Sequence, residues 1–163
     1  MVLGALLEQA TGMSFAAFVD QKLFQPLHIT DYEWSYTPTK QVMTGGGLNI
    51  RPRDMAAYGN LYLHKGFWDG EPIVSEEWID TSWQTHATID GEQTFGYLWW
   101  RRSFDVNGQK FQSYYAAGNG GQTIWVFPDL DMVVVMTSTA YGTRYGNHQP
   151  VQILQDYILP AIT

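Results

Sequence analysis

A chain of 163 residues is long enough for one domain with a single hydrophobic core, and its 45% apolar and 15% aromatic content is typical of a globular protein. A formal net charge of -7, with no basic run that could neutralise successive phosphates, argues against nucleic acid as a partner. The absence of cysteine excludes disulfides, thiolate metal sites and a cysteine nucleophile.

The first half of the chain predicts four helices, because apolar residues recur at helical spacing beside suitable capping residues. Between the second and third helix, residues 29–42 are expected to be irregular and the three glycines at 45–47 to form a flexible bend. The predicted helices are Val2 to Ala10 with Gly12 as its C-cap, one that Ser14 caps and Pro26 ends, one from Pro52 to Lys65-Gly66, and one from Ser75 to about His86.

The second half of the chain predicts an antiparallel meander, because short runs rich in Val, Ile, Phe, Tyr and Trp alternate with turn residues. Asn107-Gly108 predicts a type I′ hairpin turn, since both central positions of that turn need a positive φ. Pro150 is expected to open a closing helix. The predicted strands are Phe95 to Arg101, Gln109 to Ala116, Thr123 to Phe127 and Met132 to Thr137.

This order of elements predicts an α+β fold in which helices pack on an antiparallel sheet. The meander has two edges, and at least one edge needs other chain to cover it. We therefore expect an incomplete sheet and, for the chain by itself, self-association through the uncovered sheet surface. No uncharged apolar run approaches the roughly 18 residues of a membrane span, so no membrane-spanning helix is expected.

Common sequence signs of catalytic or metal chemistry are weak in this chain. Neither Gly-x-Ser-x-Gly nor Ser-x-x-Lys occurs, and Thr37-Pro38-Thr39-Lys40 has the spacing of the second pattern with the wrong nucleophile. We interpret that segment as a proline-containing loop with a solvated lysine. The four histidines, His28, His64, His86 and His148, lie far apart in sequence, so a metal site is not expected and we interpret them as surface or cap residues.

The segment Ala116-Ala117-Gly118-Asn119-Gly120-Gly121-Gln122 is the most informative one for function. Several glycines between two strands mark either a hairpin turn or a place where a ligand lies against bare main chain. In the second interpretation, free N–H groups at the end of the strand bind a substrate carbonyl oxygen as an oxyanion hole does. The residues alone leave both interpretations open.

A series of short motifs, in order along nearly the whole chain, resembles the serine hydrolases of the β-lactamase family. That family includes class C β-lactamases, D-alanyl-D-alanine carboxypeptidases, family VIII esterases and 6-aminohexanoate-dimer hydrolase. The motifs are Leu3-Gly4-Ala5-Leu6-Leu7-Glu8, Thr11-Gly12-Met13-Ser14-Phe15, Phe24-x-Pro26-Leu27, Gly45-Gly46-Gly47-Leu48, Pro52-x-Asp54-Met55-Ala56, Gly66-x-x-x-Gly70, Ile73-Val74-Ser75, Phe95-Gly96-Tyr97-x-Trp99-Trp100 and Gly118-Asn119-Gly120-Gly121-Gln122.

The resemblance implies a β-lactamase/transpeptidase-like fold and an acyl-serine mechanism. Its nucleophile belongs to a Ser-x-x-Lys box, its base involves the Tyr of a Tyr-x-Asn box, and a Lys-Thr-Gly-like strand closes the site. The first two boxes normally precede the helix that matches Val2 to Ala10, so we expect both to be missing and the chain by itself to be inactive. Met1 also stands directly at the helical pattern without a capping residue before it, which strengthens this expectation.

The resemblance assigns roles to the glycine segment if Gly118 matches the glycine of Lys-Thr-Gly. The backbone N–H of Asn119 is then one oxyanion donor, and Gly118, Gly120, Gly121 and Gln122 are expected to contact substrate. Ala116 stands where the family often has Lys or His. This loss of a cation favours esters or amides outside peptidoglycan as substrates.

Aromatic residues close to this strand are candidates for an apolar acyl pocket. Trp99 and Tyr114 are the expected substrate contacts, and Trp100 and Tyr115 are further candidates. Packing in the core is the alternative for all four. By the same resemblance, the bend at 45–47 is expected near the cleft, with a plain loop before a helix as the alternative.

We therefore expect residues 1–163 to form a single domain, the C-terminal portion of a serine hydrolase that cleaves a β-lactam, a D-amino-acid peptide, a carboxylic ester or a short amide. No cofactor or metal is expected. The alternative is a non-catalytic binding or structural protein, or a fragment that reassembles with a partner. Many members of the family are periplasmic or secreted, and the sequence does not fix the compartment.

Overall fold

A computed structural model describes residues 2–89, 93–143 and 145–162 of the chain. The chain divides into two compact units, Met1–Ala57 and Tyr58–Thr163, and each is described by itself. The single-domain organisation expected from the length stays a prediction.

The first unit opens with two short helices and a π-helical turn. Gly12 ends the first helix with a φ of 69°, as predicted, and its N–H donates to the carbonyl of Glu8. Ser14 caps the second helix, because its side chain accepts a hydrogen bond of 3.3 Å from the N–H of Ala17. The elements are α1 Val2–Thr11, α2 Phe15–Val19 and the π-helical turn Asp20–Phe24.

The expectation of an irregular segment over residues 29–42 is wrong. Strand β1 (Tyr32–Trp34) pairs antiparallel with β2 (Leu48–Ile50), and Tyr36 forms a further bridge with Val42. Both strands have three residues, which is too short for an alternating pattern to stand out in the sequence. Long-range ring packing supports β1, since Trp34 and Phe24 stack with centroids 6.1 Å apart.

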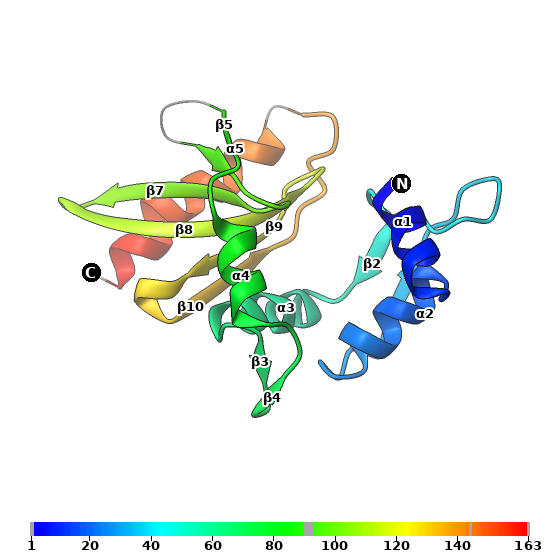
Figure 1. The fold of residues 1–163 in the computed structure, drawn as a ribbon. Helices are drawn as coiled ribbons and strands as arrows, with labels where there is room; N and C mark the ends of the chain where they lie inside the picture. The colour runs from blue at the N-terminus through cyan, green and yellow to red at the C-terminus, as the bar shows by residue number, and fades with distance from the viewer. Residues whose placement is uncertain (1, 90–92, 144, 163) are drawn as a thin grey trace. The chain divides into compact units, whose positions relative to one another are not determined.

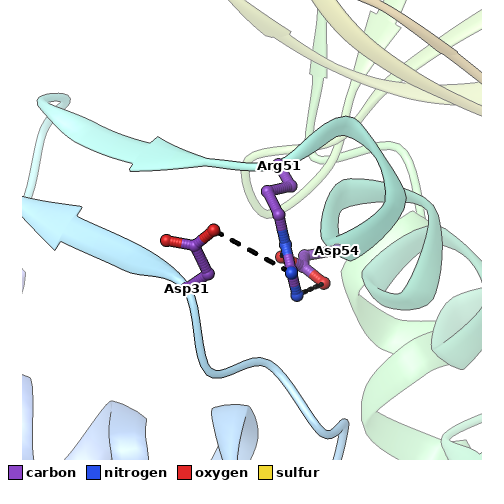
Figure 2. A network of polar contacts seen from close by, with 3 residues as sticks. All are labelled: Asp31, Arg51 and Asp54. Carbon is purple, nitrogen blue, oxygen red and sulfur yellow. Dashed lines mark hydrogen bonds and ion pairs between the residues drawn. The ribbon is translucent and has the colours of Figure 1, made fainter.

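Arg51, between the end of β2 and the start of α3 (Pro52–Leu63), contacts two carboxylates: Asp54 on α3 and Asp31 just before β1 (Figure 2). Its Nε and Nη2 donate to the two carboxylate oxygens of Asp54 at 2.7 and 3.0 Å, in the bidentate geometry that arginine favours. Asp31 lies further away, with 3.9 Å between Nη1 and its carboxylate. The Asp54 hydrogen bonds raise the pKa of the Arg51 guanidinium above its usual value. The Asp54 carboxylate, which is buried, is therefore the main partner of Arg51.

This geometry predicts unequal effects of removing the two charges. We expect Asp54→Asn to lower the urea midpoint of unfolding clearly, because it leaves Arg51 without its bidentate partner. Asp31→Asn is the matched control and should leave the midpoint unchanged within error, since Asp31 is exposed and distant. Equal losses in the two variants, measured by circular dichroism at one pH, would contradict this account.

The second unit contains one antiparallel sheet with helices on both faces (Figure 1). The strand order is β10-β9-β8-β7-β6-β5, so neighbours in the sheet are also neighbours in the sequence. A separate short hairpin of β3 and β4 lies between the helices α3 and α4 in sequence. The bounds are β3 Phe67–Trp68, β4 Glu71–Pro72, α4 Glu76–Trp83, β5 Ala87–Thr88, β6 Thr94–Phe95, β7 Trp100–Val106, β8 Gln109–Gly118, β9 Gln122–Phe127, β10 Met132–Met136 and α5 Tyr145–Ile153, with short helical turns at Pro128–Leu130, Leu154–Ile158 and Leu159–Ala161.

Alternation along the strands divides the apolar residues of this unit into two cores. One face carries Tyr115 and Trp125, which pack with Leu154 and Leu159 from the turns after α5. The other face carries Val126, which packs with Tyr62 of α3 and Ile79 of α4. Figure 1 shows α4 in front of the sheet and α5 behind it.

The predicted meander is confirmed in outline. Asn107 and Gly108 have φ values of 54° and 80°, as a type I′ turn requires, and they join β7 to β8. Three of the four predicted strands match β8, β9 and β10 within two residues at each end.

The predicted strand Phe95 to Arg101 is wrong at its centre. The chain leaves the sheet after β6, turns over Gly96, Tyr97 and Leu98, and returns at β7. A Cβ at Gly96 would lie 2.1 Å from the carbonyl oxygen of Ser82, so this turn requires glycine. Leu98 has a φ of 65°, which is rare for a bulky side chain. Aromatic content alone made this segment resemble a strand.

Two predicted helix ends also differ. α4 ends at Trp83, three residues before His86, because the chain turns at Gln84 to reach β5. α5 begins at Tyr145, so Pro150 lies inside the helix and does not open it. Proline has no N–H, so Pro150 cannot donate the helical hydrogen bond to the carbonyl of Gly146, four residues earlier.

The strained turn gives a second prediction. Leu98→Gly should be more stable than Leu98→Ala by about 1 kcal/mol, because only glycine removes the steric cost of a positive φ. Both variants lose the same exposed side chain, which makes alanine the matched control. Urea unfolding monitored by tryptophan fluorescence measures the difference. An alanine variant as stable as the glycine variant would show that the turn carries no such strain.

Strand β10 forms one edge of the six-stranded sheet, and its five residues are all half-buried. Self-association through this edge stays a prediction. Within the described residues, no single helix is long and apolar enough to cross a membrane, although α1 and the segment Phe15–Phe24 pass that test together as a pair bent by 75°.

Candidate active site at the glycine loop

The predicted site segment forms the hairpin turn between β8 and β9. Gly118 and Gln122 are the last paired residues of the two strands, and residues 119–121 form the turn. Both interpretations drawn from the sequence therefore concern one structural feature, a tight hairpin at the end of the longest strand. The residues of this hairpin differ in exposure, and this difference separates the roles that they can have.

Gly120 and Gly121 are buried, and they pack against the segment before α5 and against the first turn of α5. Their φ values are 80° and 90°, in the region that favours glycine. A Cβ at Gly120 would lie 2.6 Å from the Tyr141 ring, and one at Gly121 would lie 2.9 Å from the carbonyl oxygen of Gly146. These two glycines are thus required by conformation and by packing.

The side chain of Gln122 also anchors the glycine loop to the segment before α5. Its Nε2 donates to the carbonyl of Ser138 and lies 3.5 Å from the hydroxyl of Tyr141. The backbone adds a bond of 3.2 Å from the N–H of Ala140 to the carbonyl of Gly120. The expected contacts of Gly120, Gly121 and Gln122 with substrate stay predictions, while the structure gives each of them a packing or anchoring role.

Gly118 and Asn119 are exposed, in contrast to the two glycines that follow. The N–H of Asn119 donates no hydrogen bond to any other residue in the described part of the chain. A backbone N–H without a partner, on an exposed residue at the end of a strand, is the kind of donor that can stabilise a developing oxyanion. The geometry therefore permits the role predicted for Asn119.

The two aromatic residues expected to contact substrate lie in a core. Trp99 is 3% exposed, and its ring lies 4.4 Å from that of Tyr62 between centroids. Tyr114 stacks on Trp83 at 4.1 Å with nearly parallel planes. Ala116 packs against the same cluster. Trp99 and Tyr114 thus have a structural role here, and their contact with substrate stays a prediction.

A cavity of about 530 Å³ adjoins the exposed half of the glycine loop, on the other face of the sheet. Gly118 and Asn119 line it together with Trp100 and Tyr115, which the sequence had also suggested. The sequence assigned no binding role to the remaining lining residues, although Ala117 lay in the segment singled out for function and alternation along β8 and β9 could have placed Ala117, Thr123 and Trp125 on the face of Tyr115. These remaining residues are Gln93, Arg102, Ala117, Thr123, Trp125, His148 and Val151.

We expected no Tyr-x-Asn triplet in the chain, and the sequence shows that this expectation is wrong. The triplet occurs at Tyr58-Gly59-Asn60 and Tyr145-Gly146-Asn147. Neither stands before α1, where the family has its box. Tyr58 lies within α3, packs against the core that contains Tyr62, and stacks with Trp99. Burial raises its pKa well above the usual value, which disfavours the phenolate that a general base requires.

Within the described residues, no group of three or more His, Asp or Glu side chains is placed to hold an ion, and the expectation of no metal stays a prediction. His86, for example, stacks on Tyr97 at 3.9 Å, and its Nε2 lies 3.0 Å from the carbonyl of Thr81.

Comparisons with known proteins agree with this fold. The sequence model of the Beta-lactamase family matches residues 1–157. A 6-aminohexanoate-dimer hydrolase of Paenarthrobacter ureafaciens is 24% identical over 149 residues, which is 85% of this chain and 37% of that protein. A Bacillus anthracis protein assigned as a 6-aminohexanoate-dimer hydrolase superposes with a TM-score of 0.81 at 21% identity over 98% of this chain and 42% of its own.

A more distant neighbour is a penicillin-binding protein from Bacillus halodurans, with a TM-score of 0.65 and 15% identity over 93% of this chain and 53% of its own. The sheet with helices on both faces is thus the β-lactamase/transpeptidase-like α+β fold, of which the chain covers a part. The chain belongs to the β-lactamase family. It spans 37% of the curated relative's length and 42% of the Bacillus anthracis chain.

The division of the loop predicts different results for two glycine-to-alanine changes. Gly120→Ala should lower the unfolding free energy by about 1–3 kcal/mol, because it combines a positive φ with a clash against Tyr141. Gly118→Ala should cost less, since that residue has no positive φ and its Cβ would meet only the Gln122 side chain at 3.3 Å. Chemical denaturation of the two variants tests the ranking, and a reversed order would refute the assigned roles.

Proposed function

We propose that this chain supplies the oxyanion loop of a serine hydrolase that cleaves an ester or amide through an acyl-serine intermediate. The observation that carries the proposal is the exposed N–H of Asn119, which has no hydrogen-bond partner among the described residues and follows Gly118 at the end of β8. Membership of the β-lactamase family supports it.

In the proposed mechanism, a serine hydroxyl attacks the carbonyl carbon of the substrate, and the carbonyl oxygen gains negative charge. The N–H of Asn119 donates a hydrogen bond to this oxygen as the charge develops. Collapse of the tetrahedral intermediate expels the alcohol or amine, and water then releases the acid from the acyl-serine. No Ser-x-x-Lys box occurs in the 163 residues, so the nucleophile and its lysine would come from residues outside them.

The substrate class follows from the position before the loop. Where related enzymes often have Lys or His, this chain has Ala116, which packs against apolar and aromatic residues. A site without that cation favours carboxylic esters and amides outside peptidoglycan over β-lactams and D-amino-acid peptides. Two of the relatives described above carry the name 6-aminohexanoate-dimer hydrolase, which supports a short amide as one such substrate.

A non-catalytic binding or structural role is the second candidate. The absence of Ser-x-x-Lys from the sequence favours it, because the residues present include no activated serine of that type. A fragment that reassembles with a partner lies between the two candidates. Reaction with a fluorophosphonate probe distinguishes them, since only an assembled serine site is labelled.

The oxyanion role predicts opposite outcomes for two changes at Asn119 in a complete enzyme that contains residues 1–163. Asn119→Ala keeps the N–H and should leave kcat close to that of the parent. Asn119→Pro deletes the N–H and should lower kcat by about 10²–10³, as the loss of one such donor does elsewhere. The measurement is hydrolysis of a p-nitrophenyl ester.

Two controls make this test decisive. Circular dichroism must show that the proline variant is folded, because proline also removes backbone freedom. The 163-residue chain alone should neither hydrolyse the ester nor react with a fluorophosphonate. A folded proline variant with near-normal kcat, or an alanine variant as impaired as proline, would remove Asn119 from the oxyanion site.

A further inference from the structure

The cavity beside the glycine loop has features that the proposed oxyanion chemistry does not use. It lies on the sheet face of Tyr115 and Trp125, opposite the face on which Ala116 packs. Gly118 and Asn119 contribute the part of the lining that lies at the loop, and the rest comes from the sheet, from α5 and from Gln93 just before β6. Its volume of about 530 Å³ is within the range of small-molecule sites.

The charges that line this cavity are unlike those of the whole chain. The chain has 16 acidic and 9 basic residues, yet among the described lining residues there is no Asp or Glu, whereas Arg102 and His148 are present. The guanidinium of Arg102 forms no ion pair within the described part of the chain. A half-buried guanidinium without a carboxylate partner is suited to bind an anion, for which arginine offers two parallel donors.

Two buried polar atoms in the wall of the cavity also lack partners. Thr123 is 5% exposed and Trp125 is 1% exposed, and neither Oγ1 of Thr123 nor Nε1 of Trp125 has a hydrogen bond. An unpartnered buried polar atom is costly and therefore uncommon in folded proteins. Two other cavities of the described chain each contain one lining residue with an unpartnered buried polar atom. These residues are Thr44 at one cavity and Trp83 at the other.

The register of the sheet places these two residues on one face. Thr123 pairs with Ala117 and Trp125 pairs with Tyr115, two positions further along β9. Because side chains two positions apart point to the same side, the two unmet polar groups are neighbours. The indole N–H of Trp125 can only donate, so the missing partner is an acceptor.

Stacked aromatic rings form the apolar part of the lining. Trp100 and Tyr115 are 6.2 Å apart between centroids with planes inclined by 22°, and Tyr115 and Trp125 are 4.0 Å apart with planes inclined by 15°. Such a wall favours a ligand with a flat or apolar body. Ala117, which has a small side chain, lines the same cavity, as do His148 and Val151 of α5.

We propose that this cavity binds a small molecule in which one carboxylate is joined to an apolar body. The carboxylate binds the Arg102 guanidinium, and the apolar body lies against the rings. The Thr123 hydroxyl is covered in this structure and turns toward the carboxylate by a change of rotamer about its Cα–Cβ bond. The proposal concerns binding alone and does not depend on hydrolase activity.

Benzoate is the probe that tests it on the 163-residue chain. The indole N–H signals of the seven tryptophans are observed in a ¹H–¹⁵N correlation spectrum, and Trp125→Phe identifies the signal of Trp125. Benzoate should shift that signal saturably, because a charged acceptor enters the cavity beside it. Benzyl alcohol, which has the same ring and no charge, should shift it far less.

Adjacent arginines on β7 provide a matched control. Arg102→Gln should weaken benzoate binding about tenfold or more, since a charge-assisted hydrogen bond is lost. Arg101→Gln should leave it unchanged, because Arg101 is the next residue on the same strand and does not line this cavity. Thr123→Val, which replaces the hydroxyl by a methyl of similar size, should weaken binding about threefold to tenfold.

Three outcomes would overturn the proposal. They are the absence of a saturable shift of the Trp125 signal, an equal response to benzyl alcohol, and equal losses in the Arg101 and Arg102 variants. The spectrum of each variant reports its own folding, so a misfolded variant is recognised and Thr123→Val then decides. Loss of this site would leave the proposed role of Asn119 untouched, because that role is measured by kcat.

Discussion

The close approach of the glycine loop to the segment before α5 is the constraint on which the candidate site depends. Gly120 and Gly121 have no side chains, and the Tyr141 ring and the Gly146 carbonyl occupy the space that a Cβ would need. The Gln122 side chain closes the same contact from the end of β9. These contacts fix the turn on the side that follows Asn119, an exposed residue whose N–H donates no hydrogen bond within the described part of the chain. A donor held in advance is what oxyanion stabilisation requires, since it does not have to reorganise during the reaction.

Alternation along β8 assigns a different task to each face of the sheet. Tyr114 and Ala116 face the core shared with α3 and α4, whereas Tyr115 and Ala117 face α5. A single strand thus contributes to one apolar core, to the rim of the loop and to the cavity with Arg102. The aromatic surplus of the composition is explained by this arrangement, because rings such as Trp83, Tyr114, Tyr115 and Trp125 stack on both faces.

The sequence predicted correctly those elements that depend on interactions between residues close together in the chain. The Ser14 cap, the Asn107-Gly108 turn and the strands β8 to β10 follow from capping, from positive φ and from alternation, which act within a few residues. Elements held by distant contacts were missed. The pair β1 and β2 is brought together across a long loop, and Gly96 is required because the Ser82 carbonyl, 14 positions earlier, lies where its side chain would be.

The site shows the same division. The glycine motif located the loop, but it did not distinguish Gly118 and Asn119, which are exposed, from Gly120 and Gly121, which are buried by residues some 20 positions later. The role proposed for Arg102 could not be predicted from the sequence for a related reason. A single arginine in a strand becomes a candidate binding residue only when the structure places it at the same cavity as Thr123 and Trp125. Ala116 packs in an apolar core on one face of the sheet, whereas Arg102 places a cation in the cavity on the opposite face. If both proposals hold, the two faces of β8 differ in the charge that they accept, and Asn119 lies at the end of the strand that separates them.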